Sequence, residues 1–251
     1  MRIFYLLKIL IFILIISCFF GYNSYALNKI ILIDPGHGGI DGGAVSSSNT
    51  LEKDLNLEIS CKLREILESK NYKVYMTRES DISLSDAGSI KEKKREDLSK
   101  RCAMKKQVAC DVFLSIHMNK FPNASVKGSQ VWYPINSVKS KKLAESMHKQ
   151  FKVSLNQECN REPKGVKNEY VILRDGYSEA SIIVECGFLS NQEEEDKLKD
   201  SKYQYELCNA MVLAIEEYFN GGNLNWYLIL KAKYNLVHLL IIYLQNHPVI
   251  L

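Results

Sequence analysis

Four side chains that could carry out chemistry stand at wide intervals along the chain: His37, Glu52, His117 and Glu185. Two histidines and one carboxylate form a common ligand set of catalytic zinc, with a water in the fourth position. Zinc lowers the pKa of that water to about 7, and a second carboxylate can act as general base and then protonate a leaving amine. The first three residues are therefore candidate zinc ligands, Glu185 is the candidate base, and together they predict a zinc-dependent amide hydrolase.

Each of these residues also has a structural interpretation. His37 could be a loop histidine bonded to the backbone, and His117 could be a satisfied histidine at a strand end. Glu52 could complete a capping box with Asn49, because N-x-x-E before a periodic apolar run is that signature. Glu185 is harder to explain in this way, because it follows an apolar run and a buried carboxylate is costly unless it is paired.

The elements that must position these residues alternate between strands and helices, which is typical of an α/β sandwich with a largely parallel sheet. The expected strands are residues 29–34, 72–77, 111–117, 129–133, 170–173 and 181–185. The expected helices are residues 51–70, 91–109, 138–155 and 192–219, the last broken near residues 200–201.

The carboxyl ends of parallel strands form the usual ligand site of such a sheet. His37, His117 and Glu185 all fall at predicted strand ends, and Glu52 opens the helix that follows the first strand. His37 lies between glycines, whose backbone freedom allows a sharp turn and close approach of other groups. The fold therefore predicts that all four side chains meet at one edge of the sheet.

Several other polar residues have less specific interpretations. Asp34 could orient a ligand histidine or end its strand, and Asp41 is predicted to form a turn. Ser115 shares a strand face with His117, but it lacks the context of a nucleophile elbow, so a serine hydrolase is rejected. The charged run 91–97 is expected to be a solvated surface, with gripping of an anionic polymer as the alternative.

Composition and the chain ends complete the domain prediction. With 33 Lys+Arg against 29 Asp+Glu among 251 residues, the chain is mildly basic and lacks the pattern of a nucleic-acid-binding protein. Residues 1–26 are interpreted as a signal peptide or an N-terminal membrane anchor, and either one exports the chain. Residues 27–220 form the expected catalytic domain. Residues 221–251 are an apolar tail of unknown role, which could contact a membrane or pack on the domain.

Three short motifs and Glu52 carry a resemblance to a known family. The motifs are residues 34–39 (DPGHGG), 115–119 (SIHMN) and 184–191 (VECGFLSN). Over residues 29–219 the chain resembles the zinc-dependent N-acetylmuramoyl-L-alanine amidases of the third type. This resemblance implies a three-layer fold with a twisted, mixed sheet, Zn²⁺ held by His37, Glu52 and His117, and catalysis by Glu185.

The resemblance also implies a substrate: peptidoglycan, cut between muramic acid and L-alanine. Residues 38–44, 51–58 and 93–101 are most similar to the spore-cortex and germination-associated amidases, which remove peptides before muramic-δ-lactam forms. Such enzymes act in the cell wall or the spore intermembrane space, and some depend on an activator protein.

One residue departs from the family pattern. Cys186 stands where aliphatic residues are more usual, and it is expected to pack as a small apolar side chain. The alternatives are a zinc peptidase that cuts within the stem peptide and a non-catalytic wall-binding protein.

Overall fold

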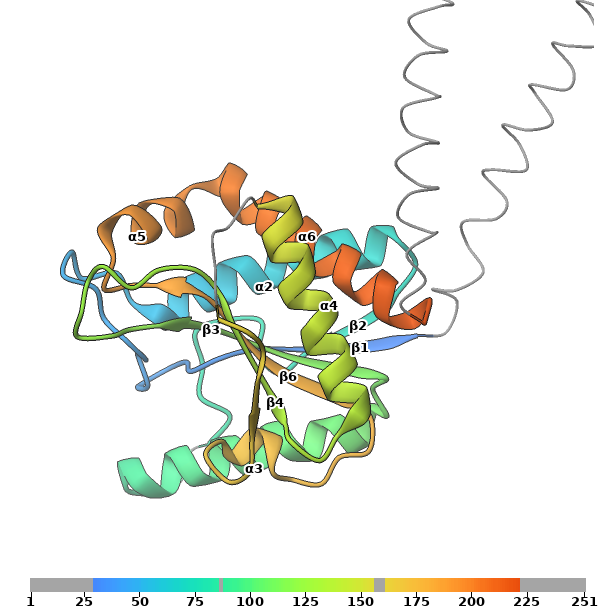
Figure 1. Cartoon of the computed structure of the whole chain (residues 1–251). Helices are drawn as coiled ribbons and strands as arrows, with labels where there is room; N and C mark the ends of the chain where they lie inside the picture. Colours follow the sequence, from blue (N-terminus) through green and yellow to red (C-terminus); the bar gives the residue numbers. More distant parts are fainter. Residues whose placement is uncertain (1–28, 86–87, 156–160, 222–251) are drawn as a thin grey trace, which may run out of the picture.

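The computed structural model describes residues 29–85, 88–155 and 161–221 (Figure 1). The predicted signal or anchor at residues 1–26 lies outside these ranges, as does the predicted apolar tail after its first residue, Gly221. None of the helices within the described ranges combines the length and the apolar character needed to cross a membrane.

A six-stranded sheet forms the centre of the domain. Its strands are β1 (Ile30–Pro35), β2 (Lys73–Met76), β3 (Val112–Asn119), β4 (Gln130–Pro134), β5 (Lys164–Val166) and β6 (Ala180–Phe188). The strand order is β2-β1-β3-β6-β4-β5. Strands β2, β1, β3 and β6 are parallel, whereas β4 runs antiparallel to β6. The predicted mostly parallel, mixed sheet is therefore confirmed.

Helices cover both faces of this sheet and complete the three layers. They are α2 (Glu52–Ser69), α3 (Ile90–Val108), α4 (Val138–Ser154), α5 (Gln192–Lys199) and α6 (Ser201–Phe219), with a short 3₁₀ helix, η1, at Val171–Leu173. In Figure 1 α3 lies on one side of the sheet, and α2, α4 and α6 lie on the other. The break predicted near residues 200–201 is real, because the Asp200 side chain caps α6 by accepting from the Tyr203 amide at 2.7 Å.

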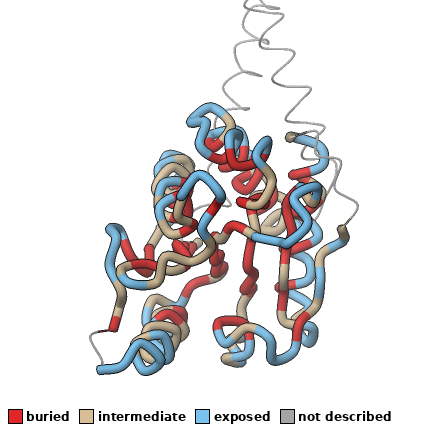
Figure 2. The backbone as a smooth tube through the Cα atoms, turned by 90° about the vertical axis from the view of Figure 1, so that its left-hand side faces the viewer, coloured by how far each residue is buried: buried red, intermediate tan, exposed pale blue. Residues whose placement is uncertain are grey.

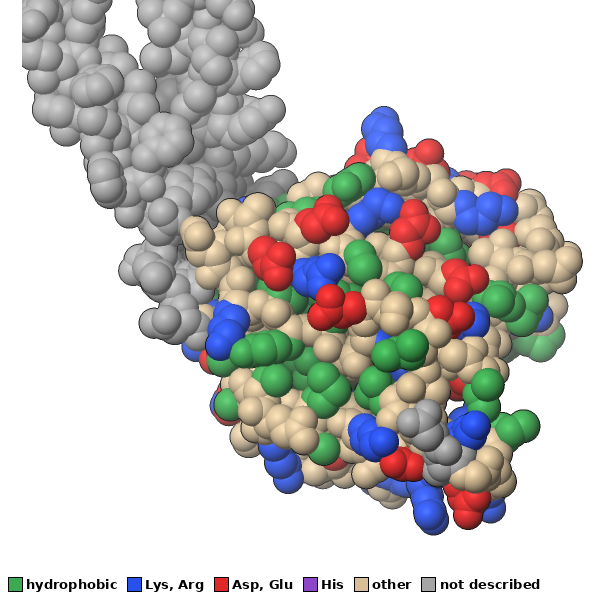
Figure 3. Space-filling view, turned by 180° about the vertical axis from the view of Figure 1, so that it is seen from behind, with side chains coloured by type: hydrophobic (Ala, Val, Ile, Leu, Met, Phe, Trp, Pro, Cys, Tyr) green, Lys and Arg blue, Asp and Glu red, His purple; other side chains and the backbone are tan. Residues whose placement is uncertain are grey.

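Alternation along the strands divides the core in two. In β3, Leu114 and Ile116 pack toward α2, whereas Phe113 packs toward η1 and the α3 side. Helix α2 closes the first core because its apolar residues recur every four positions, and those at 55, 59, 63 and 67 are all buried. Buried residues accordingly run through the centre of the domain in Figure 2, while charges of both signs are scattered over the face that Figure 3 shows.

Two local predictions were wrong. Residues 170–173 were expected to form a strand but contain η1, in which the Leu173 amide donates to the Tyr170 carbonyl at 3.1 Å. Ile172 and Leu173 are buried here as a short turn against the α3 side, so their apolar character reflects packing and not a strand. Strand β5 was not predicted, because it has three residues, one of them Gly165, and pairs only with β4.

Cysteines serve as small packing residues. The five cysteines in the described ranges are free thiols. Cys186 is fully buried in the core on the α2 side, together with Cys208. It therefore faces away from its neighbour Glu185, as its expected apolar packing requires.

Candidate active site

The loop after β1 holds His37 in a strained conformation. His37 has φ = 62°, in the left-handed region that residues with a side chain seldom adopt. Two backbone hydrogen bonds between Gly38 and Asp41, 2.9 and 3.1 Å long, close the turn that follows. Gly36 must lack a side chain, because a Cβ there would come within 2.2 Å of the His117 ring. The glycines thus let this loop approach β3 closely.

Glu52 brings the two histidines together from the first position of α2. Its Oε2 lies 3.2 Å from His37 Nε2, and its Oε1 lies 2.9 Å from His117 Nδ1. The backbone amides of Ala44 and Met118 also donate to the carboxylate, at 2.7 and 3.1 Å. Burial opposes ionisation, but the hydrogen bonds from the histidines hold the pKa of Glu52 well below its usual range.

The capping interpretation of Glu52 is wrong. The residue that precedes α2 is Leu51, and no side chain caps this helix. Asn49 instead has φ = 66° in the turn before it. Glu52 is therefore free of a helix-capping role and is only 4% exposed, pointing into the site.

His37, Glu52 and His117 together form a cluster that can hold a metal ion. Their nearest ligand atoms all lie within 4.8 Å of one another. Nitrogen and carboxylate oxygen are the donors that zinc accepts in catalytic sites. Gly43 keeps the cluster open, because a Cβ there would lie 2.5 Å from Glu52 Oε2 and 2.7 Å from His37 Cδ2. The structure thus brings the three residues predicted to bind zinc into one suitable group.

Glu185 stands beside this cluster on β6. It pairs in register with His117 of β3, so both side chains lie on the α3 side of the sheet. Its Oε2 is buried and has no hydrogen-bond partner among the described residues. Burial raises the pKa of Glu185 to about 7, with the charge of Glu52 adding to the effect and the histidines opposing it. A carboxyl group of this kind can take up and release a proton near neutral pH.

Asp41 has a role beyond the turn predicted for it. Its Oδ2 lies 3.0 Å from His37 Nδ1, which leaves Nε2 of that ring facing Glu52. The hydrogen bond to His37 is the main reason that the pKa of Asp41 falls well below its usual range. Although burial acts in the opposite direction, the hydrogen bonds to Asp41 and Glu52 raise the pKa of His37 to about 9. The same negative charge would favour a metal cation on Nε2.

Asp34, the other candidate for orienting a histidine, makes no hydrogen bond to one in the structure. It accepts from the hydroxyls of Thr77 and Ser115, both at 2.6 Å, and from Arg101 Nη1 at 2.5 Å. Burial opposes its ionisation, but Arg101 and these hydroxyls keep the pKa of Asp34 low. The Ser115 hydroxyl thus donates a hydrogen bond to Asp34, in keeping with the rejection of a serine nucleophile.

Two buried arginines, neither of which was predicted from the sequence to be functional, hold the histidine loop by its carbonyl groups. Arg101 donates to the carbonyls of Pro35 and His37 at 2.9 and 2.7 Å. Arg78 donates to those of Pro35 and Gly36 at 2.9 and 3.0 Å. All three carbonyls from residue 35 to residue 37 are therefore fixed, which offsets the strain at His37. For Arg101 the signal in the sequence was its place on the buried side of the charged helix α3, but such an arginine is easily interpreted as surface charge.

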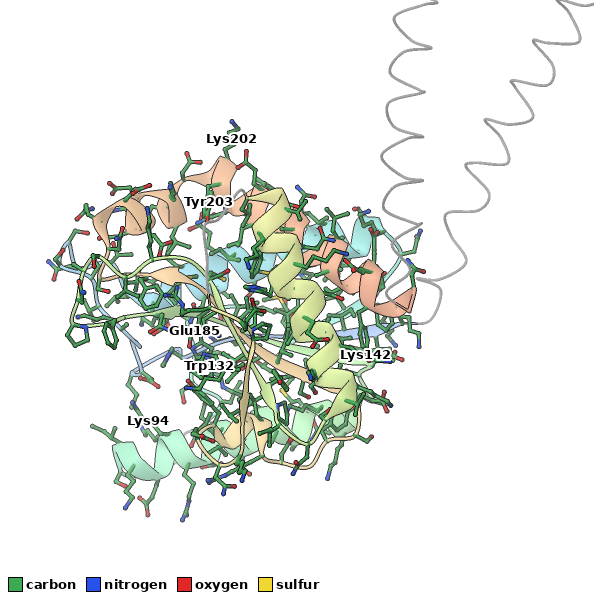
Figure 4. The ribbon with its side chains drawn as sticks, in the orientation of Figure 1. Lys94, Trp132, Lys142, Glu185, Lys202 and Tyr203 are labelled. Atoms are coloured by element: carbon green, nitrogen blue, oxygen red, sulfur yellow. The ribbon has the colours of Figure 1, made fainter. Side chains whose placement is uncertain are left out.

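A cleft of about 260 Å³ opens over these groups. His37, His117 and Glu185 lie in it, and residues 169–172 and one face of α3 form walls. Lys94 of α3 and Glu185, both labelled in Figure 4, line this cleft. The predicted meeting of the four candidate residues at one edge of the sheet is thus observed, although β3 and β6 continue beyond His117 and Glu185 to Asn119 and Phe188.

Comparisons with known proteins agree with this geometry. The chain is 34% identical over 193 residues to the germination-specific N-acetylmuramoyl-L-alanine amidase of Bacillus subtilis (strain 168), covering 76% of this chain and 80% of the relative. The CwlD amidase of Clostridioides difficile, solved in complex with the GerS lipoprotein, has a TM-score of 0.73 and 36% identity, covering 77% of this chain and 99% of that one. An N-acetylmuramoyl-L-alanine amidase from Clostridium difficile 630 has a TM-score of 0.66 and 31% identity, covering 78% and 98%.

The family profile for N-acetylmuramoyl-L-alanine amidase matches residues 31–217, nearly the whole described domain. This range includes the histidine loop, the start of α2 and the strands that carry His117 and Glu185. The chain therefore belongs to the N-acetylmuramoyl-L-alanine amidase family and is an amidase that acts on peptidoglycan.

Proposed function

We propose that this amidase uses zinc held by His37, Glu52 and His117, with Glu185 as the catalytic acid and base, to cut the amide between N-acetylmuramic acid and L-alanine. The observation that carries the proposal is the buried Oε2 of Glu185, which has no hydrogen-bond partner in the described part of the chain and lies beside a cluster of three metal-donor residues. A buried carboxylate oxygen without a partner is costly. A water and a substrate amide in the cleft would supply the missing hydrogen bonds.

The residues divide the reaction between them. Bound zinc would lower the pKa of a water and polarise the substrate carbonyl. Glu185, with its pKa raised to about 7, accepts the proton of the attacking water and delivers it to the nitrogen of the leaving L-alanine. Asp41 keeps the His37 ring oriented throughout, and the amides of Ala44 and Met118 hold the Glu52 carboxylate.

The biological setting follows from the substrate and the relatives. An enzyme that cuts peptidoglycan acts outside the cytoplasm, and residues 1–26 would export it as a signal peptide or an anchor. The similarity to a germination-specific amidase supports a role in the spore cortex, where peptide removal precedes muramic-δ-lactam formation. The CwlD amidase was solved with a lipoprotein, which supports an activator protein as a partner of this chain as well. The terminal segments would supply membrane contact.

The proposal is tested with the purified protein and peptidoglycan, by measuring new N-terminal L-alanine. Release should stop with a chelator, return with zinc and be lost in Glu185→Ala. Glu193→Ala, on the exposed side of α5, is the matched control and should release L-alanine normally. New amino termini from within the stem peptide would support the peptidase alternative. Zinc binding without any cleavage, with and without a candidate lipoprotein partner, would support a wall-binding protein.

A further inference from the structure

Two neighbouring lysines on the α3 wall of the cleft have different environments. Lys94 Nζ lies 3.0 Å from Asp41 Oδ1, so its charge is used in the group that orients His37. Lys93 also lines the cleft and is half-buried. No carboxylate of the described ranges lies within ion-pair distance of its ammonium group. Among the residues that the structure describes, Lys93 therefore brings a cation without an ion-pair partner into the cleft that contains Glu185.

The acidic groups of the same helix are engaged elsewhere. Glu92 completes the capping box with Ser89. Glu96 pairs with Lys100 at 2.8 Å, and Asp97 pairs with Arg101 at 2.5 Å. On the opposite wall, Glu169 accepts from the backbone amides of its own loop at 2.7 and 2.8 Å. Because these carboxylates already have donors, the natural partner for Lys93 is a negative charge that arrives with the substrate.

We propose that Lys93 binds a carboxylate of the peptidoglycan stem peptide, on the L-alanine side of the amide that is cut. This inference rests on the proposed function and extends it to a specificity-determining residue. The residue after L-alanine in a stem peptide is acidic, so a free carboxylate lies only a few bonds from the reacting amide. An ammonium–carboxylate hydrogen bond at the edge of a cleft is stronger than a neutral one, and partial burial reduces the screening that weakens exposed pairs.

The experiment compares two soluble substrates that differ only in charge. One is N-acetylmuramoyl-L-alanyl-D-glutamate, and the other is the same compound with both glutamate carboxyl groups amidated. With the zinc-loaded enzyme, Lys93→Gln should raise the KM for the carboxylate substrate by about three- to tenfold, a typical range for one charge-assisted contact. It should leave kcat, and the KM for the amidated substrate, within about twofold of the wild type. Lys93→Arg, which keeps the charge, should restore most of the preference.

Lys106→Gln is the matched control, because Lys106 is an exposed lysine on the same helix and does not line the cleft. Its kinetics on both substrates should equal those of the wild type. An equal change of KM on both substrates in Lys93→Gln, or no change on either, would overturn the carboxylate contact.

Failure of the proposed function has a separate signature. If the wild type cleaves neither substrate, the two compounds are instead titrated calorimetrically into the zinc-loaded protein. Tighter binding of the carboxylate compound that is lost in Lys93→Gln would support the contact without turnover. Equal affinities for the two compounds would reject it.

Discussion

The two faces of the central sheet come from alternate residues of the same strands and both bury apolar side chains, yet they differ in the charged groups that they hold. The face under α2, α4 and α6 is apolar, and Ile33, Leu114 and Val184 are fully buried there. The face toward α3 buries the ion pair of Asp34 and Arg101 and carries Glu185. One face thus supplies most of the apolar burial, and the other presents the chemistry.

This difference has a physical basis. Apolar burial stabilises without needing specific partners, whereas a buried charge costs free energy unless it is paired. The fully buried cations on the α3 side therefore have fixed partners. Arg101 pairs with Asp34 at 2.5 Å, and Lys105 pairs with Asp175 at 3.1 Å and lies 4.2 Å from the Phe113 ring centre. The buried Oε2 of Glu185 has no hydrogen-bond partner among the described residues, which indicates that this face is organised for function at some cost in stability.

The largest expected effect is on turnover. Glu185→Gln should lower the rate of L-alanine release by about 10²–10⁴-fold, the usual contribution of a general acid–base group. Zinc affinity should stay close to that of the wild type, because Glu185 is not among the three candidate ligands. Rate and zinc affinity would be measured on the same preparation. Loss of zinc together with activity would instead make Glu185 part of the metal site.

A matched pair of core substitutions, one on each side of the sheet, tests whether only the α3 side supports zinc binding. Arg101→Met should lower the free energy of unfolding by about 3–5 kcal/mol, because it leaves Asp34 buried and unpaired, and it should also weaken zinc binding by releasing the His37 carbonyl. Leu63→Ala, in the apolar core on the α2 side, should cost about 2–5 kcal/mol by leaving a cavity, with zinc affinity unchanged. Denaturant unfolding and zinc titration give both quantities. Equal losses of zinc affinity in the two variants would contradict the conclusion that only the α3 side supports zinc binding.

Asp41→Asn should act on the metal and hardly on the fold. Losing the carboxylate at His37 Nδ1 should weaken zinc binding by about 10–100-fold. Competition with a chromogenic chelator measures that affinity. Glu79→Gln is the control, since Glu79 is an exposed acid that pairs with Arg64 at 2.9 Å and does not line the cleft. If Asp41→Asn binds zinc as tightly as this control, the hydrogen bond to His37 does not tune the site.

The smallest effect is a pH-dependent change in stability of the metal-free protein. The pKa of Glu185 is raised from 4.5 to about 7, so its stabilising contribution is present below pH 4.5 and is lost as the pH rises through 7. Glu185→Gln should therefore become more stable relative to the wild type between pH 4.5 and pH 8, by roughly 1–3 kcal/mol. Comparing variant with wild type at each pH cancels most of the titration of His37. A difference that does not vary with pH would show that Glu185 is not held neutral by burial.

Much of the site was predictable because parallel strands share an edge. The carboxyl ends of parallel strands lie at one edge of a sheet, so placing His37, His117 and Glu185 near such predicted ends was enough to group them there. The conformation at residues 170–173 was not predictable in this way, because a short apolar run suits a strand and a buried turn equally well. The capping signature at Asn49 was misleading for a similar reason, since local patterns do not reveal what a carboxylate contacts across the fold.

The sequence by itself determined the alternation of strands and helices, the order of the motifs and the chemical identity of the four principal residues, because these depend on local periodicity and residue type. The tertiary structure alone decided which aspartate forms the hydrogen bond that orients His37. Asp41 lies beside the ring, while Asp34 pairs with Arg101, 67 positions away along the chain. It also decided that one lysine of an adjacent pair is neutralised while the other faces the cleft. Such choices depend on distances of a few ångströms between separate elements, which packing sets and residue spacing does not encode.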